Sequence, residues 1–216
     1  MKIQYFGHAC FKLTESTGFS IFTDPFCKIG YELPVGISSS AVTVSHDHFD
    51  HNNIKAITGA PTILQKDGVF ELGGVKITGV KSYHDEKQGA LRGENVIFKF
   101  HMDGLDICHL GDLGEKCSTA LIESLMPVNI LLIPVGGKYT IDAKTAKEYV
   151  DKIKPNIVIP MHFKTKNSII DIEKAQVFLD EFNEKDVMIS HKDELEFFKE
   201  NITEERTKII LMESAQ

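Results

Sequence analysis

A six-residue segment from His46 to His51 carries three imidazoles and two carboxylates, and it constrains the fold more strongly than any other part of the chain. The segment follows residues 41–45, an apolar and β-branched run that predicts a buried strand. A strand that ends in His-x-His-x-Asp-His presents these side chains together in the loop beyond the sheet edge. Imidazole and carboxylate are ligands that hold Zn²⁺ or a similar divalent metal. The chain is therefore expected to fold with a metal site at the edge of a sheet.

Three further side chains of the same chemical type, His84, Asp112 and His162, follow predicted strands. Those strands are expected at residues 75–80, 105–110 and 156–160. Because α/β folds build their sites just past the ends of strands, these side chains are expected to meet the 46–51 segment. Two neighbouring metal ions need more ligands than one loop can supply, and these three residues would complete the set. His101, His109 and His191 are not expected to be ligands.

The order of predicted elements indicates an α/β fold. Short strands dominate the first half, at residues 2–6, 10–14, 19–23, 41–45, 62–65, 69–72, 75–80, 95–101 and 105–110, with a short helix beginning within 52–57. The second half alternates helices at 118–126, 142–153 and 171–183 with strands at 129–134, 156–160, 187–190 and 195–198. Asp142 is expected to cap the second of these helices, and Pro155 to stop it. This order predicts two stacked sheets flanked by helices.

The residues around these sites resemble the metallo-β-lactamase superfamily of hydrolases, from Met1 to about Phe198. Four short motifs resemble the UPF0173-like branch of small bacterial and archaeal metal-dependent hydrolases: Gly7-His8-Ala9, Thr23-Asp24-Pro25, Gly111-Asp112 and Pro134-Val135-Gly136-Gly137. That branch is related to the ascorbate-phosphate lactonase and to the phospholipase D that acts on N-acyl phosphatidylethanolamine. The resemblance implies an αββα sandwich of two mixed β-sheets flanked by helices. We expect one metallo-hydrolase domain over residues 1–199 and a tail, 200–216, of undetermined docking.

The resemblance also implies how the ligands divide between two divalent metal ions. The first ion would take His46, His48 and His84; the second would take Asp50, His51 and His162; Asp112 would bridge both. Three protein ligands for each ion leave open positions for water and substrate, as a catalytic site requires. Zinc is the default for ligation rich in imidazole, and Mn²⁺ would also satisfy this set.

The implied reaction is hydrolysis of a small ester, lactone or phosphodiester by a metal-bridging hydroxide. Asp50 and His8 are the candidate catalytic residues, with His8 as an acid or a hydrogen-bond donor to the leaving group. A structural turn histidine is the alternative for His8. Asp24 is expected to accept a hydrogen bond from a ligand imidazole and fix its orientation.

Residues near the site suggest further contacts with substrate. Lys138, Tyr139 and Lys164 could contact an anionic group or a substrate oxygen, although solvated loop positions are the plainer interpretation. Specificity is expected to come from the loops at residues 26–40 and 136–141.

Two other functions stay open for a chain of this fold. A mononuclear iron oxygenase uses fewer ligands, and iron content with oxygen consumption would favour it. A non-catalytic metal-binding protein would bind its full complement of metal without turning over any generic ester or phosphodiester. Diiron flavoprotein reductases are not favoured, because they carry a Glu where this chain has His48.

Composition limits the classes of molecule that the protein is expected to bind. The 216 residues suffice for one domain with a sizeable core, and the net charge is −7. Basic residues are scattered along the chain. A nucleic-acid substrate is therefore not expected, and a small-molecule substrate is expected instead. The first residues read as a strand and no apolar run approaches the roughly 20 residues of a membrane span, which predicts a cytoplasmic protein without a span. The four cysteines have no C-x-x-C spacing, and no disulfide is expected.

Overall fold

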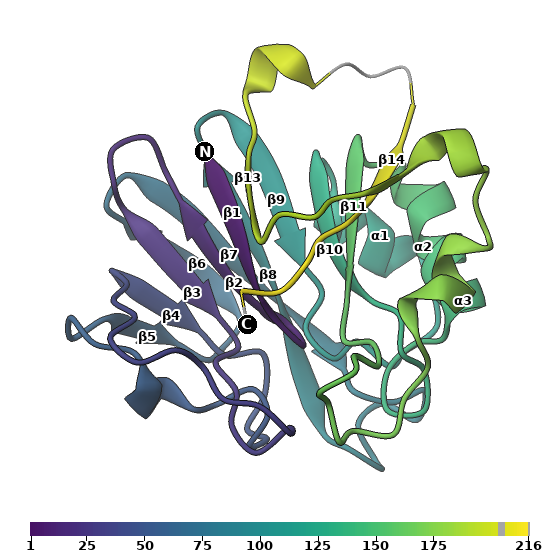
Figure 1. Ribbon diagram of the computed structural model, residues 1–216, viewed down its shortest axis with the longest axis horizontal. Coiled ribbons are helices and arrows are strands. Elements are labelled where there is room, and N and C mark those ends of the chain that lie inside the picture. Colours follow the sequence, from purple (N-terminus) through teal and green to yellow (C-terminus); the bar gives the residue numbers. More distant parts are fainter. Residues whose placement is uncertain (203–205, 216) are drawn as a thin grey trace.

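Two β-sheets stack face to face in the computed structural model, which describes residues 1–202 and 206–215 (Figure 1). The smaller sheet contains β1 (Lys2–Gly7), β2 (Cys10–Thr14), β3 (Ser20–Thr23), β4 (Ala41–Thr43), β5 (Thr62–Leu64) and β13 (Glu194–Glu196). Its strand order is β13-β1-β2-β3-β4-β5. The pairs β3–β4 and β4–β5 are parallel and the others antiparallel, so the sheet is mixed.

The larger sheet is also mixed. It contains β6 (Gly68–Leu72), β7 (Val75–Tyr83), β8 (Glu94–Met102), β9 (Leu105–His109), β10 (Ile130–Pro134), β11 (Ile157–Met161), β12 (Val187–Ile189) and β14 (Lys208–Leu211). Its order is β12-β14-β11-β10-β9-β8-β7-β6. The hairpins β6–β7, β7–β8 and β8–β9 are antiparallel, whereas β9, β10, β11, β14 and β12 run parallel. Two mixed sheets are what the sequence predicts.

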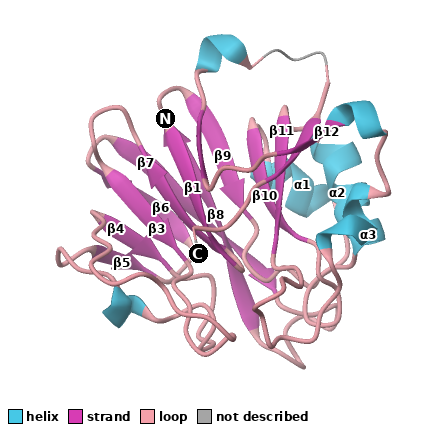
Figure 2. Cartoon of the chain, in the orientation of Figure 1, coloured by secondary structure: helices cyan, strands magenta, loops and turns pink. Residues whose placement is uncertain are grey.

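The α-helices gather beside the larger sheet, on its side away from the smaller one (Figure 2). They are α1 (Thr119–Leu125), α2 (Ala143–Ile153) and α3 (Ala175–Leu179), and short 3₁₀ turns lie at η1 (Ile54–Ala56), η2 (Glu184–Asp186) and η3 (Lys199–Asn201). The crossovers from β9 to β10 and from β10 to β11 move along the sheet in the same direction, so connections of one hand put α1 and α2 on the same face. No helix within the described residues is long and apolar enough to cross a bilayer.

The outer face of the smaller sheet is covered by a loop instead of by an α-helix. Phe26, Ile29 and Leu33, from the segment between β3 and β4, pack in one buried cluster with Phe22 and Val42 of the sheet. Pro25, Gly30, Pro34 and Gly36 interrupt that segment, and prolines and glycines of this density prevent a regular helix. The fold is therefore a two-sheet sandwich whose α-helices lie on one side within the described residues.

Two predicted helices differ from the structure. The helix expected over residues 171–183 is reduced to α3, because the backbone N–H of Glu173 donates to Gly136 O and its carbonyl accepts from Lys164 N. These tertiary hydrogen bonds compete with helical ones at that residue. The helix expected to begin within 52–57 is the 3₁₀ turn η1.

The C-terminal segment docks as a strand. Residues 208–211 form β14, which lies between β11 and β12 and pairs in parallel with both. Ile209 and Ile210 are buried there. The apolar run of the tail thus completes the larger sheet; residues 203–205 and 216 of that tail lie outside the described residues.

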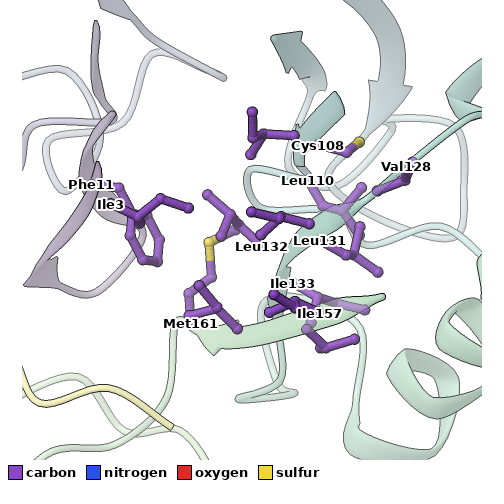
Figure 3. Packing of buried hydrophobic residues seen from close by; sticks show 14 of the residues in the cluster. Ile3, Phe11, Cys108, Leu110, Val128, Leu131, Leu132, Ile133, Ile157 and Met161 are labelled. Atoms are coloured by element: carbon purple, nitrogen blue, oxygen red, sulfur yellow. The ribbon is translucent and has the colours of Figure 1, made fainter. Parts of the chain in front are cut away.

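The main core lies between the two sheets and extends to the helices. Figure 3 shows Ile3 and Phe11 of the smaller sheet pointing toward Leu132 and Met161 of the larger one. Every residue of β10 is buried, because one face of the strand meets the smaller sheet and the other meets the helices. This explains why β10 is a continuous apolar run without alternation.

Replacing Ile133 by alanine should lower the free energy of unfolding by about 2–5 kcal/mol, because it leaves a cavity in a fully buried strand. The matched control is Ile189→Ala in the edge strand β12, where the side chain is 59% exposed and the expected loss is below about 1 kcal/mol. Urea denaturation measures both. Equal losses would contradict the core assigned to β10.

Candidate metal centre

The predicted ligands meet because the strands before them run in the same direction. In the larger sheet, β7, β9 and β11 are mutually parallel in direction, and they end just before His84, Asp112 and His162. In the smaller sheet, β1, β3 and β4 also share a direction and precede His8, Asp24 and the 46–51 segment. The loops after these strands gather at one end of the sandwich (Figure 1).

The carboxylate of Asp112 lies at the centre of the site. Its Oδ2 is surrounded by four imidazole Nε2 atoms, at 3.2 Å from His51, 3.2 Å from His162, 3.4 Å from His84 and 3.9 Å from His46. Burial by itself would raise the pKa of Asp112, but the surrounding imidazoles hold that pKa well below its ordinary value. A carboxylate in this position can contact two ions at once.

The structure brings all seven predicted ligands into three overlapping groups whose potential ligand atoms lie within 4.8 Å of one another. The groups are His46, His48 and His84; His8, Asp50, His51 and His162; and His46, His51 and Asp112. The first two follow the expected division between two ions, with His8 added to the second, and the third joins them through Asp112. The role of these residues as ligands stays a prediction.

Unpaired polar atoms test whether a cation fits this site. Within the described residues, His46 Nε2, His51 Nε2 and Asp112 Oδ1 are buried and have no hydrogen-bond partner. His84 Nδ1 and His162 Nδ1 are in the same condition. A buried polar atom without a partner costs about 1–3 kcal/mol, and so many in one place are rare in folded proteins. A divalent cation would satisfy the atoms that face Asp112, so the residues present fit a metal.

Asp24 fixes the orientation of two of the imidazoles. Its carboxylate accepts hydrogen bonds from Ser45 N at 2.8 Å, Ser45 Oγ at 2.6 Å and His51 Nδ1 at 2.9 Å. Because the Ser45 hydroxyl donates to Asp24, it accepts from His46 Nδ1 at 2.9 Å. With Nδ1 held by these acceptors, both imidazoles direct Nε2 toward Asp112, and a neutral ring held in this way binds a metal through Nε2. Burial by itself would lower the pKa of His51, but Asp112 and Asp24 hold that pKa well above its ordinary value when no cation is bound. The hydrogen bond expected for Asp24 is present, whereas no sequence motif indicated the role of Ser45.

Asn95 supports Asp112 in a comparable way. Its side-chain Oδ1 accepts from the backbone N–H of Asp112 at 3.0 Å, and its Nδ2 donates to Ser82 Oγ and to Leu110 O. Gly111 has a φ of +57°, and a Cβ there would lie 2.4 Å from Asn95 Oδ1. The turn before Asp112 thus requires glycine. Sequence reasoning placed Asn95 only in a strand and missed this contact.

His8 lies beside Asp50, one of the predicted ligands. Its Nε2 is 3.2 Å from Asp50 Oδ2, and its ring centroid is 4.2 Å from that of His162. The backbone carbonyl of His8 accepts from Tyr5 Oη and from His162 N, which holds the turn in a left-handed conformation of φ +54°. Burial lowers the pKa of His8 to about 4, so the imidazole is neutral near pH 7.

An open cavity of about 770 Å³ leads to the centre. His48, Asp50, His84, Asp112 and His162 line its inner part. Its outer part combines apolar and charged side chains, Phe49, Ile169, Ile170, Tyr139, Lys28, Arg92, Asp47 and Asp171. His8 does not line it. Tyr139 is the one predicted substrate contact from the 136–141 loop that does.

The two lysines named as possible substrate contacts have protein partners. Lys138 forms an ion pair with Asp171. Lys164 donates to the carbonyls of Ser168 and Ile170, both at 2.7 Å, and so holds the loop that follows it. His109, which was not expected to be a ligand, is buried, and its Nε2 lies 2.8 Å from Ala9 O.

Asp112→Asn is expected to reduce the metal content to about half that of the wild-type protein or less, because an amide cannot bridge two cations as a carboxylate does. Elemental analysis of the purified protein measures this. Asp47→Asn is the matched control, since Asp47 is exposed, lies between two predicted ligands and hydrogen-bonds only Asn52 among the described residues. Equal metal content in the two variants would remove Asp112 from the site.

Asp24→Asn is expected to weaken metal affinity by about 10- to 100-fold, since the amide cannot accept all three hydrogen bonds and its N–H₂ would oppose the donors. Competition with a fluorescent chelator measures the affinity. Asp103→Asn serves as the control, since Asp103 is a partly buried carboxylate outside the site that accepts from Ser16 and pairs with the N-terminal ammonium. Unchanged affinity in Asp24→Asn would show that the imidazoles keep their orientation without it.

Comparison with known proteins finds relatives for this chain. The model of the beta-lactamase superfamily domain matches residues 2–162. A UPF0173 metal-dependent hydrolase of Methanospirillum hungatei JF-1 is 30% identical over 192 residues, covering 78% of this chain and 85% of that protein. A second, from Carboxydothermus hydrogenoformans, is 32% identical over 200 residues, covering 76% and 85%.

Solved structures of other proteins have the same fold as this chain. A Thermotoga maritima protein assigned to the Zn-dependent hydrolases of the metallo-β-lactamase superfamily superposes with a TM-score of 0.82 and 35% identity, over 99% of this chain and 98% of that one. An isothiocyanate hydrolase from Delia radicum gut bacteria superposes with a TM-score of 0.67 and 15% identity, over 92% and 99%, and shares the fold.

Proposed function

Because the chain belongs to the UPF0173 metal-dependent hydrolase family of the metallo-β-lactamase superfamily, we propose that it uses two divalent metal ions to hydrolyse a small ester, lactone or phosphodiester. The observation that supports two ions is the position of Asp112, whose Oδ2 lies within 3.4 Å of imidazoles from both predicted ligand groups. A cavity of about 770 Å³ supports a small-molecule substrate.

The ligand roles follow the grouping of the side chains. His46, His48 and His84 would hold one ion, Asp50, His51 and His162 the other, and Asp112 both. When bound, a pair of ions of this kind, zinc by default, would supply Lewis acidity and lower the pKa of a bound water. Asp24 and Ser45 keep His51 and His46 in the tautomer that binds a cation.

Asp50 and His8 would handle protons. Asp50 lines the cavity, and its Oδ2 is 3.2 Å from His8 Nε2. A proton released during attack on the substrate can be held at Asp50 Oδ2 and shared with His8 Nε2. His8 is neutral near pH 7 because burial lowers its pKa to about 4. Its Nε2 can therefore take this proton from Asp50 and would hold it briefly as an imidazolium paired with the Asp50 carboxylate. His8 thus would act through Asp50 and not by facing the substrate.

A cytoplasmic location is also proposed. Cys10 and Cys108 are buried and free, and Cys27 and Cys117 are also unpaired. Free thiols persist in a reducing compartment, which supports this location.

His8→Gln is expected to lower kcat for a generic ester by about 10²-fold with little change in metal content, because glutamine can hydrogen-bond Asp50 but cannot exchange a proton. His101→Gln, at a surface histidine paired with Asp106, is the matched control. Turnover of 4-nitrophenyl acetate and bis(4-nitrophenyl) phosphate, together with metal analysis, measures the effect. Loss of metal in His8→Gln would instead make His8 a ligand of the second ion.

The proposed reaction is tested by removing the metal. Chelation should abolish hydrolysis, and two equivalents of zinc or manganese should restore it. One iron per chain with oxygen consumption would favour the oxygenase. Full metal occupancy without turnover of any ester, lactone or phosphodiester would favour a metal-binding protein.

A further inference from the structure

Arg92 stands out at the outer part of the cavity. The chain has only two arginines, Arg92 and Arg206, and the first lines the cavity above the metal centre. One guanidinium nitrogen of Arg92 donates to the carbonyl of Lys138 at 3.1 Å, and the group lies over the Tyr139 ring, 5.7 Å from its centroid. Within the described residues Arg92 has no carboxylate partner. Most of its donors therefore remain available beside the cavity.

The loop that carries Arg92 is held by one buried carboxylate. Asp85 is 3% exposed and accepts backbone hydrogen bonds from Lys87, Gly89, Leu91 and Arg92, at 2.8, 3.1, 2.9 and 2.8 Å. These hydrogen bonds hold the loop in one conformation before any ligand binds. Binding of a ligand at Arg92 therefore costs little backbone entropy.

With two divalent ions bound, the charges around the cavity would give an excess of positive charge; without the ions, the carboxylates that line it outnumber the cations. Lys138 is paired with Asp171, whereas Lys28, which also lines the cavity, has no ion pair within residues 1–202 and 206–215. Asp47 is exposed and accepts from Asn52. Asp50 and Asp112, the other carboxylates that line the cavity, are the proposed ligands of two divalent ions, which would more than offset their charge.

We propose that Arg92 is a specificity-determining residue that binds an anionic group of the substrate, a carboxylate or a phosphate, with Lys28 contributing from the same cavity and Asp85 acting as the residue that positions Arg92. This inference rests on the proposed function and narrows it: the substrate is an anionic ester, lactone or phosphodiester. The planar guanidinium can engage either anion through two parallel hydrogen bonds, which a lysine cannot do.

Calorimetric titration of the metal-loaded protein with inorganic phosphate tests the phosphate arm. Arg92→Ala should weaken phosphate binding about tenfold. Arg92→Lys should recover part of the affinity, because the positive charge remains but the two parallel hydrogen bonds of the guanidinium are lost. Arg206→Ala is the matched control, at the other arginine of the chain, which lies near Asp186 and away from the cavity. Metal content is measured in each sample, because loss of a metal ion would also weaken phosphate binding and must be distinguished from loss of the contact with Arg92.

The carboxylate arm uses two esters that differ in one charge, mono(4-nitrophenyl) succinate and 4-nitrophenyl acetate. The ratio of their kcat/KM values should fall about tenfold in Arg92→Ala and stay constant in Arg206→Ala. A change in phosphate affinity alone identifies phosphate as the recognised group, and a change in the ratio alone identifies carboxylate. If neither differs between the wild-type protein and Arg92→Ala, the inference is wrong.

Failure of the proposed function gives a different result from failure of the anion site. Phosphate titration needs no turnover, so a protein that hydrolyses nothing but loses phosphate affinity in Arg92→Ala would refute the hydrolase and keep the anion site. The positioning role of Asp85 has its own readout, a double-mutant cycle. Asp85→Asn should weaken phosphate binding in the wild-type background and add no further loss in Arg92→Ala, whereas additive losses would exclude this role.

Discussion

A buried carboxylate among imidazoles is the interaction on which this structure depends. The Oδ2 of Asp112 lies within 3.9 Å of four Nε2 atoms, and several of the polar atoms around it have no hydrogen-bond partner within the described residues. Such a cluster is unfavourable in a protein interior unless a cation satisfies it. A cation would relieve this cost, and the two sheets hold the predicted ligands around Asp112.

The residues that support the predicted ligands act mainly by accepting hydrogen bonds from backbone N–H groups and from imidazoles. Asp24 accepts from the Ser45 backbone and from His51, Asn95 accepts from the backbone of Asp112, and Asp85 accepts from four N–H groups of its own loop. Each of these contacts ties a loop of the site to a fixed acceptor. The site is therefore built on loops, yet it has the order expected of regular elements.

Three residues of the site have a strained backbone conformation. His8, Asp24 and His162 have φ values of +54°, +42° and +50°, a conformation that costs energy for residues other than glycine. Each follows directly on a strand and is tied to a neighbouring segment: Asp24 N donates to Thr43 O, and His162 N donates to His8 O. The surrounding hydrogen bonds offset the strain and turn the side chains toward the centre.

Much of this arrangement could be predicted from the sequence. Ligand-type side chains after apolar runs indicated a metal site at strand ends, and periodicity located most strands and the helix capped by Asp142, because residue chemistry and local pattern are short-range information. The tertiary structure alone decided the shortening of α3, the insertion of β14, and the contacts of Asn95 with Asp112 and of Arg92 with the cavity. These depend on which loops meet across two sheets, and no local pattern encodes a hydrogen bond between segments that only folding brings together.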